Sequence, residues 1–148
     1  MFLHFLQEKA HKLAFLELAH LIANADGFVN RKEQLSLKTY MGEMDLPDTF
    51  FAVGQPREIG AIIGELQDEQ VKHIIFLEIL LLIFADGDYN ENERSMLSEL
   101  KHHFGVSEET YDVFKDWVIR MDQLKIEGMK LILGSFRATP GRSGSASK

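Results

Sequence analysis

Two acidic turns hold the residues of this chain whose types and spacing suit chemistry. The second turn follows Ala85 and has carboxylate and amide side chains at short intervals. These side chains belong to Asp86, Asp88, Asn90 and Glu93. Oxygen ligands of this kind suit a hard divalent cation such as Ca²⁺ or Mg²⁺. The sequence therefore predicts a candidate cation site at this turn.

The first turn repeats the pattern with fewer ligands. Asp26, Asn30 and Glu33 correspond to Asp86, Asn90 and Glu93, but Phe28 stands where the second turn has an aspartate. If one of the two turns binds a metal ion, we expect it to be the second, and the first is the weaker candidate.

The same residues also have a purely structural interpretation, which stays open. The glycine of each Asp-Gly turn suits the left-handed residue that ends a helix, and the asparagine suits the N-cap of the next helix. The glutamate then falls three residues later, where it completes a capping box. Caps alone would account for the pattern.

Each glutamate is also predicted to point inward. Glu33 lies four residues before Leu37, and Glu93 lies four residues before Leu97, so each shares the apolar stripe of its helix. Two carboxylates beside one tight turn repel each other unless a proton, a base or a cation lies between them. A cation is one way to relieve this repulsion, and the cation hypothesis therefore stands beside the structural interpretation, in which the turns are ordinary solvated acidic loops.

The turns belong to an internal repeat. Shifting the sequence by 60 residues aligns the Ala, Asp, Gly, Asn and Glu of residues 25–33 with those of residues 85–93, and Leu21 and Leu37 with Leu81 and Leu97, without gaps. A repeat unit of three helices is expected, with copy one over about 10–66 and copy two over about 69–120.

The elements that must position these turns are all helical. Apolar residues recur at helical spacing, and no stretch alternates as a strand does. We expect a compact all-α array of about seven helices near residues 2–24, 31–44, 56–66, 69–85, 91–104, 108–120 and 122–134. Residues 1–136 form a single domain in this interpretation, and the Gly- and Ser-rich residues 137–148 form a disordered or non-native tail.

The amino-acid composition excludes several classes of binding partner and ligand. The 148 residues have a formal net charge of −7, which argues against nucleic acid as a partner, and no cysteine, so any metal must be held by oxygen or imidazole. The most apolar stretch, residues 74–85, is too short to span a bilayer. The first residues lack the basic start of a signal peptide, and a cytoplasmic location is expected.

One acidic residue lies in that apolar stretch. Glu78 shares a helix face with Ile74, Ile75 and Leu82, on a helix that is apolar all round and therefore central. A buried carboxylate is costly unless it is paired, so we expect Glu78 to have a basic or backbone partner, or a raised pKa. A structural ion pair is the favoured account.

These motifs resemble the TerB-like family, which includes tellurite-resistance TerB proteins and the region of the DjlA co-chaperone before its J-domain. The resemblance covers roughly residues 10–120, and its specificity rests on the pairing of the two copies. The second copy contributes four stretches: Phe76-Leu77-Glu78-Ile79, Phe84-Ala85-Asp86-Gly87, Asn92-Glu93-Arg94 and Phe104-Gly105-Val106-Ser107. The first copy contributes Ala23-Asn24-Ala25-Asp26-Gly27 with Glu33. It implies a duplicated helical domain with an acidic, cation-binding surface and a non-enzymatic role. By position it carries over five acidic residues: Asp26, Glu33, Glu78, Asp86 and Glu93.

The leading hypothesis is thus an interaction or sensing module, with a cation at the second turn, an unidentified protein partner, and a role in tellurite or other stress response that the resemblance alone implies. The alternative is a metal-free, chaperone-adaptor-like protein-binding scaffold.

A helical di-iron enzyme is the third hypothesis, because Glu17 and His20, and likewise Glu99 and His102, have the Glu-x-x-His spacing of such sites. Glu99 and His102 are predicted to lie opposite the apolar stripe of their helix, and His20 opposite Leu18 and Ile22. Ligands of such a site must project into the bundle, so these directions disfavour the di-iron hypothesis.

Overall fold

The structure is a computed structural model of the whole chain. It describes residues 1–24, 31–52, 54–55, 57–84 and 91–134, and within these ranges it leaves the side chains of residues 31–35 and 91–93 undescribed. The two Asp-Gly turns and the tail from residue 135 therefore lie outside the described residues.

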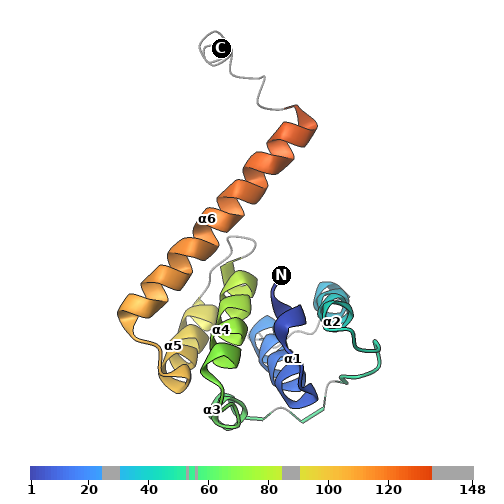
Figure 1. Cartoon of the computed structure of the whole chain (residues 1–148), viewed down its shortest axis with the longest axis vertical. Helices are drawn as coiled ribbons and strands as arrows, with labels where there is room; N and C mark the ends of the chain where they lie inside the picture. Colours follow the sequence, from blue (N-terminus) through green and yellow to red (C-terminus); the bar gives the residue numbers. More distant parts are fainter. Residues whose placement is uncertain (25–30, 53, 56, 85–90, 135–148) are drawn as a thin grey trace.

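The described residues form one short 3₁₀ helix and six α-helices (Figure 1). The 3₁₀ helix η1 spans Leu3–Phe5, and the α-helices are α1 (Lys9–Ala23), α2 (Arg31–Glu43), α3 (Ile59–Gly64), α4 (Glu69–Phe84), α5 (Glu91–Phe104) and α6 (Glu108–Leu133). The described residues contain no strand, so the predicted all-α class is confirmed.

Several helix bounds differ from the prediction. The helix expected near residues 56–66 is shorter, because α3 spans only Ile59–Gly64. The first α-helix begins at Lys9 rather than at residue 2, because Leu3 and Leu6 are buried and η1 packs against α2 and α4 instead of extending α1. The last two predicted helices are one 26-residue helix, α6, because no residue near position 121 breaks a helix. Gly134, at φ 78°, ends it.

The repeat appears in the helix bounds and in the turns that close them. With the shift of 60 residues, α1 and α2 match α4 and α5 to within one residue at each end. Asp45 (φ 60°) and Gly105 (φ 70°) are equivalent positions, and each follows its helix in the left-handed region. In both copies, two backbone N–H groups after the helix bond back to carbonyl oxygens of its last turn, as in a Schellman motif.

The two copies differ after this turn. Ser107 caps α6 by accepting a hydrogen bond from Thr110 N, whereas Pro47 leads into a short turn closed by Phe50 N and Pro47 O. The next described helix of copy one is therefore the six-residue α3, while copy two continues directly into the 26-residue α6, the longest of the described helices.

Helix α4 is central, as its all-round apolar sequence predicts. It packs against α1, α5, α6 and η1, and Phe76 and Ile79 on it have no exposed surface. The core also includes the fully buried Phe15 of α1 and Ile62 of α3. Among the described residues, no helix has the length and apolar character that crossing a membrane requires.

Candidate interaction surface

The predicted cation ligands lie mostly outside the described residues. Asp26, Asn30, Asp86, Asp88 and Asn90 fall in the undescribed turns, and the side chains of the two paired glutamates, Glu33 and Glu93, are undescribed although α2 and α5 contain them. Elsewhere, within the described ranges, no three His, Asp or Glu side chains are grouped closely enough to hold a metal ion. The cation hypothesis stays a prediction.

Glu78 has the partner that its burial demands. Its side chain is only 5% exposed, and its Oε2 accepts a 2.6 Å hydrogen bond from the backbone N–H of Phe2. The amino group of Met1 lies 3.3 Å from the same oxygen. The prediction of a backbone or basic partner for Glu78 is confirmed, and that partner is the segment that contains η1.

A second carboxylate, Glu43, also binds this segment, and no sequence pattern predicts it. We call Glu43 and Glu78 together the carboxylate cradle. Glu43, the last residue of α2, accepts a 3.2 Å hydrogen bond from Leu3 N and lies 2.6 Å from the amino group of Met1. Its equivalent in copy two is His103, so the repeat carries no signal for this role. Glu43 and Glu78 together hold η1 between α2 and α4.

The negative charges of Glu78 and Glu43 both act on the phenol of Tyr40. Burial raises the pKa of its phenol to about 12, with smaller contributions from the negative charges of Glu78 and Glu43. The phenol is therefore protonated at neutral pH. Its ring packs edge-on against the ring of Phe15, with 5.1 Å between the ring centroids.

A groove of about 530 Å³ opens beside this cradle. Helices α2 and α4 form one wall, and α6 forms the other with these side chains: Val118, Asp122, Lys125, Ile126 and Met129. The α2 and α4 wall is largely apolar, with Tyr40, Leu81, Leu82 and Phe84, while Glu78 supplies a carboxylate. The groove is thus a largely apolar channel whose charged lining includes Glu78, Asp122 and Lys125.

The C-terminal part of α6 extends past the other helices (Figure 1). We call residues 119–133 the α6 arm. Six of its large apolar side chains are 41–84% exposed: Leu124, Ile126, Met129, Leu131, Ile132 and Leu133. Apolar surface gathered in this way on a monomer marks an interaction site more often than scattered exposed residues do.

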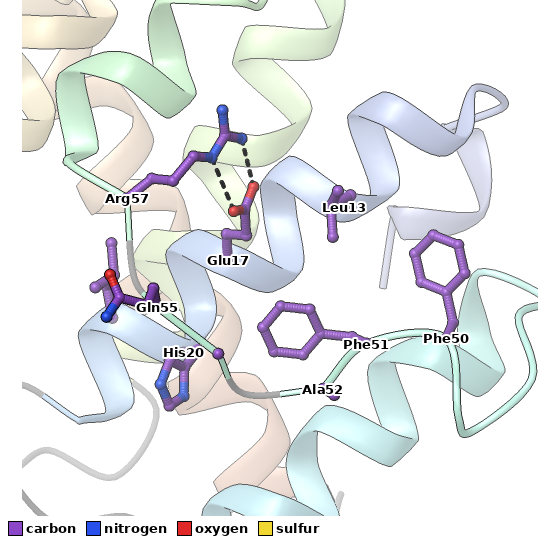
Figure 2. A pocket seen from close by; sticks show the side chains of 10 residues that line it. Leu13, Glu17, His20, Phe50, Phe51, Ala52, Gln55 and Arg57 are labelled. Carbon is purple, nitrogen blue, oxygen red and sulfur yellow. Dashed lines mark hydrogen bonds and ion pairs between the residues drawn. The ribbon is translucent and has the colours of Figure 1, made fainter.

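A smaller pocket of about 240 Å³ lies between α1 and the chain before α3 (Figure 2). At one end the Arg57 guanidinium binds Glu17 through two hydrogen bonds of 2.6 and 3.0 Å, and it also donates a 2.7 Å bond to Glu65. These bonds raise the pKa of Arg57, and the bond to Arg57 lowers the pKa of Glu65. The pair fastens α1 to the chain that enters α3.

His20 corrects one prediction. It does not lie on an outer face of α1 opposite Leu18, because it is only 7% exposed and packs near the ring of Phe51, which covers that side (Figure 2). No pattern in the sequence predicts that Phe51 covers this face of α1.

The two Glu-x-x-His pairs also stay apart. Glu17 is bound by Arg57 beside His20, whereas Glu99 and His102 are exposed on α5. These four described residues therefore do not assemble a shared metal site.

Comparison with known proteins adds no assignment: no family model, curated protein or solved structure matches this chain.

Proposed function

We propose that this protein is a TerB-like interaction module, and that it binds an amphipathic helix with basic side chains in the groove between α4 and α6. The observation that carries the proposal is the groove itself, which places an apolar channel beside the exposed α6 arm. Helix-in-groove binding uses this combination of an apolar channel and a helical apolar face.

The distribution of charge selects a basic partner. Residues 1–118 contain 21 Asp and Glu against ten Lys and Arg, whereas residues 119–148 contain two against six. The body that forms one wall of the groove is therefore strongly acidic. At the groove itself Asp122 and Lys125 balance each other, and Glu78 is paired with the amino group of Met1, so the selection for a basic partner comes from the body as a whole. Complementary charge favours the encounter with a basic helix and disfavours an acidic one.

Two synthetic helical peptides with the same leucine stripe test this proposal, one with lysine and the other with glutamate at the polar positions. We expect the lysine peptide to bind in a fluorescence anisotropy titration and the glutamate peptide to bind at least about tenfold more weakly. Binding of the lysine peptide should also weaken with added salt, because salt screens exposed charges.

Ile126→Asp places a charge at an exposed groove residue, and Val113→Asp is the matched control, since Val113 is 66% exposed on α6 but does not line the groove. We expect Ile126→Asp to weaken the lysine peptide by at least about tenfold and Val113→Asp to leave it unchanged. Equal binding of both peptides, or equal effects of both substitutions, would count against the groove.

The cation at the second turn remains a separate proposal, which rests on the sequence pattern. A metal that binds the folded state raises thermal stability with its concentration. We expect millimolar Ca²⁺ or Mg²⁺ to raise the Tm of EDTA-treated protein, and Asp86→Asn with Glu93→Gln to abolish the rise. The absence of any rise in the wild type would leave the metal-free scaffold as the better account. A role in tellurite or other stress response rests on the family resemblance.

A further inference from the structure

The α6 arm carries a second pattern, at the spacing of a helix pair. Five of its residues recur at alternating intervals of three and four along the helix: Ile119, Asp122, Ile126, Met129 and Leu133. We call them the arm stripe. This is the spacing of the contact seam between two paired helices. Its four apolar members are 39–77% exposed, so the other described helices leave most of the seam uncovered.

We propose that the arm stripe pairs with the arm stripe of a second copy of this chain, with the two α6 arms antiparallel about a two-fold axis at Ile126. This inference rests on the proposed function, since it names the amphipathic helix that enters the groove. Residues 119–133 contain three Lys and Arg against two Asp and Glu, in contrast to the acidic body. A two-fold contact uses the same patch on both copies, so the patch must be complementary to itself.

Charge complementarity along the arm supports the second copy as the occupant. An antiparallel pair centred on Ile126 places Lys130 of each copy at the level of the second copy's Asp122, because the two residues lie four positions on either side of the centre. Asp122 is the only charged member of the arm stripe, and Lys130 lies on the adjoining side of the helix. Two Asp122 to Lys130 pairs thus form in one dimer.

The same register fills the groove. Leu133, at the tip of one arm, lies level with the second copy's Ile119, one residue beyond Val118, which lines the groove. The apolar tip, Leu131–Leu133, is the most exposed part of the arm, and it would be covered by the wall that contains Leu81 and Phe84. An anionic lipid surface is the weaker alternative occupant, because it would repel the acidic body.

Charge reversal tests the pairing, with mass measured by sedimentation equilibrium. We expect the wild-type chain, 16.9 kDa as a monomer, to sediment at twice that mass at micromolar concentration. Asp122→Lys and Lys130→Asp should each give monomers, because each places like charges opposite each other twice. The double variant, and an equimolar mixture of the two single variants, should regain the doubled mass. Asp112→Lys, an exposed reversal near the start of α6, should leave the dimer intact.

The inference is overturned if the wild type remains monomeric, if the dimer survives both single reversals, or if neither the double variant nor the mixture recovers it. Binding of the monomer to anionic lipid vesicles in place of self-association would also overturn it. A monomer that still binds the lysine peptide would overturn the self-pairing alone and leave the proposed function standing, whereas loss of peptide binding as well would overturn both.

Discussion

Replacing Leu3 and Leu6 together with alanine is expected to lower the free energy of unfolding by about 5 kcal/mol or more. Both side chains are essentially fully buried, at 0% and 2% exposure, although they lie at the start of the chain. A buried Leu→Ala change costs about 2–5 kcal/mol because it removes apolar contacts and leaves a cavity. Since a domain of this size has about 5–15 kcal/mol in total, much of the double variant should be unfolded.

Urea denaturation followed by fluorescence measures this loss, because the single tryptophan, Trp117, packs 5.8 Å from the ring of Phe2. Phe5→Ala is the matched control, since Phe5 lies in the same segment but is 57% exposed, and it should cost less than about 1 kcal/mol. If the double variant were as stable as Phe5→Ala, the segment would not be part of the core.

Glu78→Ala is expected to have the next largest effect, a loss of about 3 kcal/mol or more. The substitution removes the acceptor of the part-buried hydrogen bond from Phe2 N–H, and it removes a buried side chain from the core. Glu78→Gln should cost less, because the amide oxygen can still accept that hydrogen bond. Glu69→Ala, an exposed change on the same helix, should stay within about 0.5 kcal/mol in the same urea experiment.

Tyr40 gives this series a second measurement. Loss of the charge at Glu78 should lower the pKa of Tyr40 from about 12 toward the ordinary value near 10. Because the folded pKa lies above the unfolded one, the protonated phenol stabilises the fold below pH 10, and that contribution is lost as the pH rises toward 12. Ultraviolet titration of the phenolate, with Tyr40→Phe to identify its signal, should show the shift in Glu78→Gln. An unchanged titration would mean that Glu78 does not act on Tyr40.

The sequence predicted the features that local pattern controls. Helix bounds followed from apolar spacing, and the shift of 60 residues matched α1 and α2 to α4 and α5. Burial of Glu78 was also predictable, because a helix that is apolar all round must be central. Its equivalent, Leu18, is fully buried too, so the repeat conserves burial at this position while the chemistry differs.

Contacts between segments that lie far apart in the sequence were not predictable. Glu43 became part of the cradle only because η1 folds back between α2 and α4, and no spacing in the sequence encodes that contact. His20 was placed on the outside for the same reason, since the segment that contains Phe51 crosses α1. The groove likewise requires α6 to continue unbroken past residue 121, whereas the apolar spacing predicts the end of one helix and the start of another there.

The length of α6 has a mechanical consequence. Its N-terminal half is fixed to the body by Tyr111 and Val118, both buried, while the arm beyond them rises about 22 Å at 1.5 Å per residue. A tilt of about 10° at the base of the arm would therefore move its tip by about 4 Å, which is about three quarters of a helical turn. Small changes in packing around Val118 would thus set the direction in which the whole arm points.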